Sequence, residues 1–384
     1  MRKIVIFTGN RADYGLLHPV IQHLTTDPYF QVTLIISGSH LSVDYGQTVD
    51  EINCVGLYNI VKIDLADLIS SSKVEVLKSY AMLVEKGNEV LAEIMPDALL
   101  IAGDRYETFA MAVATFYRNI PIAHIFGGDL SQGGHMDDSV RHAATKLAHI
   151  HFTTNQDSYQ RVIGLGEEKW RVHNVGSPFV DTVLAGEYAS PLEIKENLEL
   201  NLGKPFILFT QHPVTTEPDD AYRQVKESLE ALKKLKIQTI ITYPCNDLGS
   251  EAIIGAIKEY LNVSHFIVRK SLGQRLYIGC LKLSACVAGN SSSGLMETPI
   301  FKVPCVNIGT RQAGRLRSTN VIDAGYNQVD IKKATKKAIT DRNFLDQVRR
   351  CENPYGEGNT SKKIAAILKQ MLSNNKILKK QMTY

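Results

Sequence analysis

The densest run of side chains suited to chemistry lies between His124 and His151. Polar groups crowd a glycine-rich loop there, which holds Asp129, and Asp137 and Asp138 follow where a helix is predicted to begin. Two carboxyl groups can act as acid and base when their surroundings separate their pKa values. Either Asp137 or Asp138 could instead cap the helix, whereas Asp129 has no such structural role. Asp129, Asp137 and Asp138 are therefore residues that could carry chemistry, and the pattern leaves the choice between Asp137 and Asp138 open.

Three further loops directly follow short apolar runs that are predicted to be strands. They are Thr8-Gly9-Asn10-Arg11, Gly103-Asp104-Arg105 and Gln211-His212-Pro213. The first loop lacks the spaced glycines of a dinucleotide site, and its arginine suits a nucleotide sugar or another anion. Asp104 could also be a helix N-cap, and His212 a buried structural histidine. Open α/β sheets bind ligands at the carboxyl ends of their strands, so these loops supply candidate site residues. The candidates are Arg11, Asp104, Arg105 and His212.

A serine-rich loop in the second half of the chain gives the clearest indication of a phosphate site. Ala288-Gly289-Asn290-Ser291-Ser292-Ser293-Gly294 follows a predicted strand and opens a helix that contains Glu297. Hydroxyls and free N–H groups at a helix N-terminus can bind a diphosphate, and a carboxylate one turn later can accept two ribose hydroxyls. Arg311 and Arg315 follow the next predicted strand and add positive charge to the same rim. This pattern predicts a nucleoside diphosphate as ligand, and capping of the following helix alone is the alternative.

The histidine spacing does not indicate a metal site. Four histidines lie between His135 and His151, but only His149-x-His151 has close spacing, and no His-x₃-His motif with a paired carboxylate is present. The three spaced glycines of a dinucleotide site are also missing. We expect neither a metal nor a cofactor.

Alternating strands and helices must position these loops. Apolar runs at 3–8, 32–37, 98–102 and 121–125 alternate with helical stretches, and runs at 205–210, 239–243, 265–268, 285–288 and 304–308 repeat the pattern. The alternation predicts parallel sheets covered on both faces. A polar connector at 176–203 divides the chain into residues 1–178 and 179–384, with a last helix at about 360–375 packing back toward the first domain. The predicted fold class is α/β, with two Rossmann-like domains facing a cleft.

Length and composition agree with a packed protein of two domains. The chain has 384 residues, 44% of them hydrophobic, and its 43 basic and 40 acidic residues leave a net charge of +3. That balance gives no nucleic-acid footprint. The six cysteines are far apart and form no CxxC pair, which is typical of reduced thiols. No signal-peptide core and no run near the ~18 residues of a membrane span is present. We expect a cytoplasmic protein without a membrane partner.

Seven stretches follow one another in order along almost the whole chain. They are Arg11, Gly103-Asp104-Arg105, Gly127-Gly128 through Lys146, His212-Pro213, Gly289 to Glu297, Asn307 to Arg315, and Asn353 to Gly358. Taken together and in register, they resemble the hydrolysing UDP-N-acetylglucosamine 2-epimerases of sialic-acid biosynthesis. Each motif alone is weak, and their shared order makes the resemblance specific.

The resemblance implies the two-domain GT-B architecture of nucleotide-sugar glycosyltransferases, with UDP held mainly by the C-terminal domain. It implies that the proton at sugar C2 is removed as UDP leaves C1, and that water adds to the resulting glycal to give N-acetylmannosamine. Asp104 and Asp137 carry over as catalytic carboxylates, and His212 and Arg11 as groups that stabilise the departing diphosphate. Which carboxylate is the base stays open. The residues implied to bind UDP are Arg11, Arg105, His212, Ser291, Ser292, Glu297 and Arg311. The expected partner is a UDP-sugar, without metal or NAD, and the expected assembly is a homodimer or homotetramer.

Two positions depart from the family pattern. Relatives can place a further catalytic glutamate next to Gly127-Gly128, where this sequence has Phe126, and Asp129 can take over that role. Relatives also carry an asparagine directly after Pro244 as a UDP contact, whereas Asn246 stands one place later here.

Several related functions share these motifs. The leading expectation is UDP-N-acetylglucosamine as substrate, and the alternative is the same chemistry on UDP-N,N'-diacetylbacillosamine, which differs at sugar C4 and C6 where pocket shape decides. A non-hydrolysing epimerase is a weaker match to the Gly-Gly-Asp and Asp-Asp-Ser-Val-Arg-His runs. A GT-B glycosyltransferase or a non-catalytic sensor would share the UDP motifs, but a sensor would leave Asp104, Asp129 and Asp137 unexplained. Release of UDP without an acceptor separates the epimerase from both.

Overall fold

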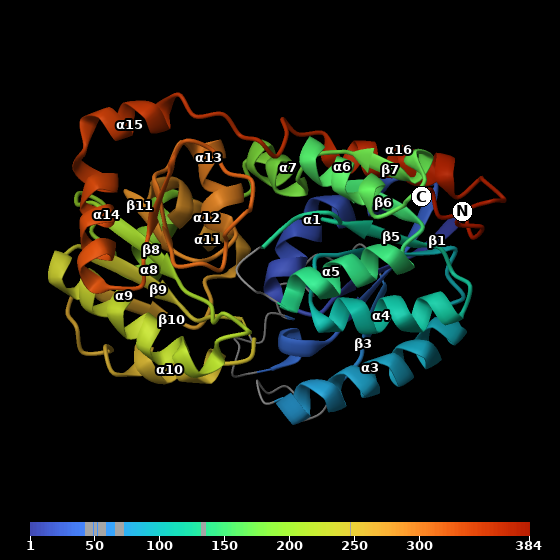
Figure 1. The fold of residues 1–384 in the computed structure, drawn as a ribbon, viewed down its shortest axis with the longest axis horizontal. Helices are drawn as coiled ribbons and strands as arrows, with labels where there is room; N and C mark the ends of the chain where they lie inside the picture. The colour runs from blue at the N-terminus through green and yellow to red at the C-terminus, as the bar shows by residue number, and fades with distance from the viewer. Residues whose placement is uncertain (43–48, 50–51, 53–58, 66–72, 132–135, 246) are drawn as a thin grey trace. The chain divides into compact units, whose positions relative to one another are not determined.

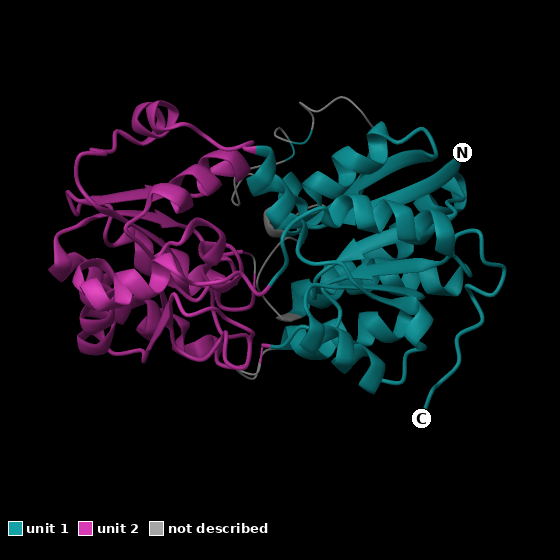
Figure 2. Ribbon diagram, turned by 90° about the horizontal axis from the view of Figure 1, so that it is seen from above, with its two compact units in different colours: residues 1–130, 136–185, 355–384 teal, residues 131–135, 186–354 magenta. Residues whose placement is uncertain are grey.

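The computed structural model spans residues 1–384 and describes all of them except 43–48, 50–51, 53–58, 66–72, 132–135 and 246. The chain divides into two compact units (Figure 2). Unit 1 consists of residues 1–130, 136–185 and 355–384, and unit 2 of residues 131–135 and 186–354. No helix within the described ranges is both long enough and apolar enough to cross a membrane.

Unit 1 is built on a parallel sheet with the strand order β3-β2-β1-β4-β5-β6-β7. Its strands are β1 (Arg2–Thr8), β2 (Phe30–Ile36), β3 (Asn59–Lys62), β4 (Ala98–Ala102), β5 (Ile122–Ile125), β6 (Ile150–Thr153) and β7 (Val172–Asn174). Every residue of β4 is buried, as expected for a central strand covered by helices on both faces.

The helices of unit 1 form two layers around this sheet (Figure 1). Helices α3 (Lys73–Ile94), α4 (Tyr106–Tyr117) and α5 (Met136–Leu147) pack side by side, and α1 (Arg11–Thr26) packs against α7 (Pro178–Ala185) and α16 (Thr360–Met371). Helix α6 (Gln156–Gly164) and the short turns η1 (Gly38–Leu41) and η2 (Lys169–Arg171) complete the described elements. A core that includes Val5, Leu99 and Met111 lies between the sheet and the layer containing α4.

Unit 2 repeats the architecture with a parallel sheet in the order β10-β9-β8-β11-β12-β13. Its strands are β8 (Phe206–Thr210), β9 (Gln238–Thr242), β10 (Phe266–Arg269), β11 (Cys286–Gly289), β12 (Cys305–Ile308) and β13 (Val321–Ala324). Its helices are α8 (Pro191–Leu198), η3 (Pro218–Asp220), α9 (Ala221–Leu235), α10 (Ser250–Lys258), α11 (Gly273–Leu283), α12 (Ser293–Met296), α13 (Thr298–Phe301), α14 (Gln328–Thr340) and α15 (Arg342–Arg349). The α/β fold class expected from the alternating sequence pattern is confirmed.

Each sheet has a point at which the strand order reverses. In unit 1 the chain passes from β1 to β2 on one side and returns to place β4 on the other. In unit 2 the reversal lies between β8 and β11. Ligands of doubly wound sheets bind outside the carboxyl ends of the strands at such reversals. The predicted site loops at 9–11, 103–105, 211–213 and 290–292 follow these four strands.

The stretch at 176–203, which we expected to be a polar connector, contains two helices. Helix α7 buries Phe179 and Val180 against unit 1, and α8 buries Ile194 and Leu198 within unit 2. Ser190 explains why α8 forms, since it makes a capping box with Glu193 and is followed by a proline at the first helical position. Unit 1 extends to residue 185, which lies within the uncertainty of about 10 residues on a boundary expected at 178.

Candidate active site

A fully buried arginine contacts three acidic residues of unit 1. Arg141 lies on α5 and is 1% exposed. Its Nη2 atom donates to the carboxylate of Asp104, and its Nη1 atom donates to the carboxylate of Asp138. Nη1 also donates to the main-chain oxygen of Asp129 at 2.7 Å. One guanidinium thus holds three acidic segments together at the carboxyl edge of the sheet.

Asp129 is held by two hydroxyl groups. Its Oδ1 atom accepts hydrogen bonds from Ser158 Oγ at 2.6 Å and Thr154 Oγ1 at 2.9 Å, and the residue is 4% exposed. The loop before it needs glycine, because Gly128 has a φ of +82° and a Cβ there would lie 2.3 Å from the main-chain oxygen of Ser158. Phe126 precedes this turn with a φ of +71°. A left-handed conformation in a bulky residue is costly and often marks a functional loop.

Asp137 lies in the first turn of α5 and is partly exposed. Its neighbour Asp138 makes an ion pair with Arg141. Both carboxylates remain in the first turn of the helix, where negative charge is favourable.

His124 fixes the loop that follows β4. Its Nε2 atom lies 2.7 Å from the main-chain oxygen of Gly103, and its Nδ1 atom lies 3.2 Å from Thr145 Oγ1. Burial lowers the pKa of His124 to about 4, so the imidazole is neutral at physiological pH. The histidine therefore acts as a hydrogen-bonding support for the residue directly before Asp104.

Two further acidic side chains surround Arg105. The guanidinium donates to Glu107 through Nε at 3.2 Å and Nη2 at 3.4 Å, and Glu107 is completely buried. Asp13 accepts a hydrogen bond from Asn10 at 2.6 Å. Burial raises the pKa of Asp13 to about 8, against the opposing effect of the Arg105 charge.

The candidate residues of unit 2 meet around Asn290. The Asn290 amide accepts from the main-chain N–H of His212 at 2.6 Å and donates to the His212 carbonyl at 2.8 Å. The Asn290 carbonyl accepts from Arg311 at 3.3 Å and from Gln312 at 2.9 Å. Asn290 is fully buried, and its hydrogen bonds join the loops after β8, β11 and β12.

Asp247 lies close to both His212 and Arg311. Its Oδ2 atom is 4.0 Å from His212 Nδ1 and 3.9 Å from Arg311 Nη2. The main-chain N–H of Cys245 donates to His212 Nδ1 at 3.3 Å, which places the proton of the neutral ring on Nε2. The arrangement orients a histidine N–H donor and an arginine at one edge of the sheet, as an anionic ligand requires.

The serine loop leads into a short helix with Glu297 at its end. Ser291 and Ser292 are partly exposed, and Ser292 is the N-cap of α12. Gly289 before them has a φ of +128°, and a Cβ there would lie 1.9 Å from the Thr210 carbonyl oxygen. Burial raises the pKa of Glu297 to about 8, and its Oε2 atom has no hydrogen-bond partner in the described part of the chain. A buried acceptor of this kind is suited to a ligand hydroxyl.

Two of the predicted site residues cannot be placed. The side chain of Arg11 and the whole of Asn246 lie outside the described residues. Among the residues that are described, no group of three or more His, Cys, Asp or Glu side chains could hold a metal ion.

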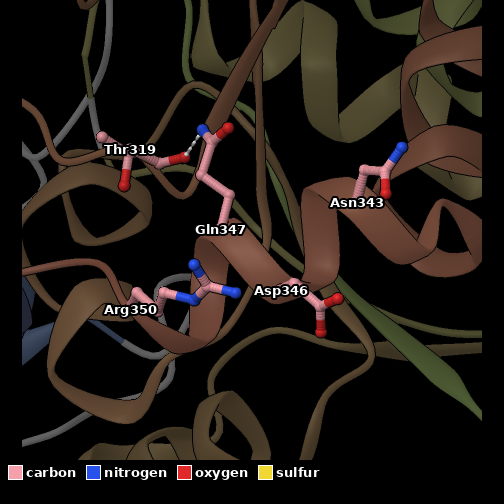
Figure 3. A pocket seen from close by; sticks show the side chains of 5 residues that line it. All are labelled: Thr319, Asn343, Asp346, Gln347 and Arg350. Atoms are coloured by element: carbon pink, nitrogen blue, oxygen red, sulfur yellow. Dashed lines mark hydrogen bonds between the residues drawn. The ribbon is translucent and has the colours of Figure 1, made fainter.

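A separate pocket of about 370 Å³ lies on unit 2 around α15 (Figure 3). It is lined by Thr319, Asn343, Asp346, Gln347 and Arg350, and Gln347 donates to the Thr319 carbonyl at 2.6 Å. None of the predicted site residues lines this pocket.

Sequence reasoning identified the acidic loops but missed the residues that hold them. Asp104, Asp129 and the first turn of α5 come together through Arg141, and His212 and Arg311 through Asn290 and Asp247. The spacing from Asp138 to Arg141 is a helical i,i+3 pair, which could have indicated the contact on α5. Nothing in the local sequence indicates the contact from Arg141 to Asp104, 37 residues away.

Two doubly wound α/β units, each with a parallel sheet, give the chain the GT-B-like fold of the UDP-GlcNAc 2-epimerase structures. The chain belongs to the UDP-N-acetylglucosamine 2-epimerase family, whose pattern it matches over residues 22–369. The resemblance inferred from the sequence motifs is therefore confirmed.

Relatives and solved structures agree with this assignment. The chain is 33% identical over 386 residues, 100% of both chains, to a Legionella pneumophila protein named UDP-N,N'-diacetylbacillosamine 2-epimerase (hydrolyzing). It is 33% identical to the Escherichia coli polysialic acid biosynthesis protein P7, covering 98% of this chain and 96% of that protein. The crystal structure of UDP-GlcNAc 2-epimerase from Neisseria meningitidis bound to UDP-GlcNAc has a TM-score of 0.82 at 19% identity, over 96% of this chain and 100% of that one.

Proposed function

We propose that this protein is a hydrolysing 2-epimerase that converts UDP-N-acetylglucosamine into N-acetylmannosamine and UDP. The observation that carries the proposal is the binding of Asp104, Asp138 and the Asp129 main chain by the buried Arg141. Several carboxyl groups at one sheet edge can supply both the base and the acid that such a reaction needs. The proposal also agrees with the family and with the names of its relatives.

The two units have different parts in this proposal. Ser291, Ser292, Glu297, Arg311, His212 and Asn246 would bind UDP, and Arg11 and Arg105 would add contacts to the diphosphate. The Oε2 of Glu297, which has no hydrogen-bond partner among the described residues, supports a ribose contact, and the placement of His212 and Arg311 beside Asp247 supports a diphosphate contact. Asp104, Asp129 and Asp137 would act on the sugar.

The proposed reaction has two balanced steps. A carboxylate removes the proton from C2, the electron pair of the C2–H bond forms the C1–C2 double bond, and the C1–O bond breaks to release UDP. Water then adds to the glycal, with hydroxide at C1 and a proton at C2 from the opposite face. Pairing with the Arg141 guanidinium stabilises an ionised Asp104, and cationic groups beside the diphosphate stabilise the leaving group.

UDP-N,N'-diacetylbacillosamine is the second candidate substrate. The Legionella pneumophila relative, which aligns along its whole length, is named for that sugar. Both substrates undergo the same chemistry at C1 and C2, so the proposed catalytic residues are the same for each.

Proton NMR in deuterated water tests the function directly. The purified protein is incubated with UDP-N-acetylglucosamine, without acceptor or added metal, and the anomeric signals are followed. Formation of N-acetylmannosamine with deuterium at C2, together with free UDP, is the expected result. Turnover only of the bacillosamine nucleotide would move the assignment to that substrate, and absence of turnover with both would contradict the proposed reaction.

Asp104→Asn tests the role of the carboxylates. We expect this variant to bind UDP nearly as tightly as the wild type and to lose turnover by roughly a thousandfold, because Asp104 would act on C2 and not on UDP. Titration calorimetry with UDP and the NMR assay measure the two quantities. An equal loss of UDP binding would show that Asp104 has a different role.

A further inference from the structure

Arg105 is held by a carboxylate two residues further along the chain. Arg105 is the residue before α4, and Glu107 is in its first turn. Two nitrogens of the guanidinium face the two carboxylate oxygens, Nε to Oε2 at 3.2 Å and Nη2 to Oε1 at 3.4 Å. The Arg105 side chain is 9% exposed and that of Glu107 is fully buried. A two-point contact of this kind fixes the plane of a guanidinium as well as its position.

The Glu107 side chain cannot move without disturbing two glycine loops. A Cβ on Gly9 would lie 2.8 Å from Glu107 Cβ and 3.1 Å from its Cγ. A Cβ on Gly38 would lie 3.3 Å from Glu107 Oε1. The loops after β1 and β2 therefore pack directly on this side chain, and the carboxylate is locked in place at the reversal of strand order between β1 and β4.

We infer that Glu107 is a positioning residue that orients the Arg105 guanidinium toward the diphosphate of the substrate. This inference rests on the proposed function, because it takes Arg105 as a diphosphate contact. Glu107 would not touch the substrate itself and would act only through Arg105.

The direction in which UDP affinity changes when Glu107 loses its charge separates a positioning role from a purely electrostatic one. Glu107 is a negative group beside an anion-binding arginine, so removing its charge alone would strengthen UDP binding. Loss of orientation would weaken binding, because the guanidinium would no longer be held in the geometry that a phosphate needs. Because a charge-assisted bidentate contact is strong and directional, we expect the loss of orientation to dominate.

A double-mutant cycle with UDP measured by titration calorimetry tests the inference on the full-length protein. We expect Arg105→Gln and Glu107→Gln each to weaken UDP binding roughly tenfold, and the double variant to bind no more weakly than Arg105→Gln alone. In turnover, Glu107→Gln should raise KM by a larger factor than it lowers kcat. Unchanged or tighter UDP binding in Glu107→Gln, or additive losses in the double variant, would overturn the inference.

Glu167→Gln is the matched control, because it also removes a buried carboxylate from unit 1. Glu167 is 1% exposed and pairs with His151 at 3.0 Å near the amino end of β6, away from the candidate residues. We expect it to lower thermal stability while leaving UDP affinity and KM unchanged. A loss of UDP affinity in this variant as large as that in Glu107→Gln would mean that general destabilisation explains both, and would overturn the inference.

Arg105→Lys tests the same idea without altering the buried carboxylate. Lysine keeps the charge but cannot reproduce the planar two-point contact, so a loss close to that of Arg105→Gln is expected. Wild-type affinity in Arg105→Lys would overturn the inference. If Arg105→Gln binds UDP normally while the wild type forms product, Arg105 is not a diphosphate contact and only the inference fails. If the wild type forms no product, the proposed function fails.

Discussion

Glu297 has a carboxyl group that is mostly protonated at neutral pH, because burial raises its pKa to about 8. Ribose hydroxyls that donate to this group would favour its ionised form and lower the pKa on binding. We therefore expect UDP binding at pH 7 to release up to one proton, and UDP affinity to rise as the pH approaches 8. Calorimetry in buffers with different ionisation enthalpies counts the released protons.

Glu297→Gln provides the comparison for this prediction. The amide cannot ionise, so the proton release at pH 7 should disappear and the affinity should no longer rise toward pH 8. Proton release of the same size in Glu297→Gln would assign the titration to another group.

The stability of the folded protein should depend on pH through Asp13. Burial raises the pKa of Asp13 to about 8 in the folded protein, against 3.8 for a free carboxyl. A raised pKa means that the folded state holds the proton more tightly, so this stability is fully present below pH 3.8 and is lost progressively as the pH rises to about 8. Asp13→Asn should therefore gain stability over the wild type by about 1.4 kcal/mol per pH unit between pH 4 and 8. Urea unfolding at several pH values measures the difference, and a constant difference would contradict the prediction.

At the scale of an element, the turn after β11 depends on Gly289. With a φ of +128° and the Thr210 carbonyl in the way, an alanine there must displace the backbone that leads to Ser291. We expect Gly289→Ala to abolish measurable UDP binding and to destabilise unit 2 by at least about 2 kcal/mol. Calorimetry and thermal unfolding test the two parts of this prediction.

Gly255 is the matched control in the same unit. It lies inside α10, and apart from its chain neighbours and the nearby backbone of its own helix, no described atom would come within 4 Å of an added Cβ. Gly255→Ala should leave UDP binding unchanged and stabilise the helix by about 0.5–1 kcal/mol. Similar losses in both alanine variants would show that the conformation at 289 is not the cause.

Local signals in the sequence predicted the elements better than the contacts between them. Apolar runs and helix-capping residues were sufficient to place β4 and the start of α5, because each pattern is set within one segment. The capping box at Ser190 was also a local signal, and it lay within a stretch that we read as a connector because of its polar composition. The polar face of a short surface helix looks the same in composition as a loop.

The contacts that complete the site join segments far apart in the sequence. Arg141 meets Asp104 across 37 residues, and Asn290 meets His212 across 78. Such pairs are decided by strand order and register, which a single sequence does not encode locally. The predicted site residues were therefore those at strand ends, and the side chains that hold them in place were missed.

At the scale of the whole molecule, residues 355–384 return to unit 1 after the chain has completed unit 2. The last residues are fixed there by buried polar contacts. Arg171 donates to the carbonyls of Ile377 at 2.6 Å and Lys379 at 2.9 Å. Lys380 lies 2.8 Å from Glu167 and donates to the carbonyls of Lys146 and Ala148 at 2.7 Å each. These contacts satisfy carbonyls at the C-terminal end of α5, the helix that bears Arg141.

Lys380→Met should destabilise unit 1 by about 2 kcal/mol, because two carbonyls lose their donor and the buried Glu167 loses one of its cationic partners. Lys379→Met is the control, since its side chain is exposed and only its main chain takes part in the contact with Arg171. Thermal unfolding measures the stability, and hydrogen exchange should show faster exchange at the end of α5 only in Lys380→Met. UDP affinity should stay unchanged in both variants, because Lys380 lies near the amino end of β6, away from the proposed UDP residues. If the two variants unfold alike, the C-terminal segment is held by its main-chain contacts alone and the lysine cap contributes nothing.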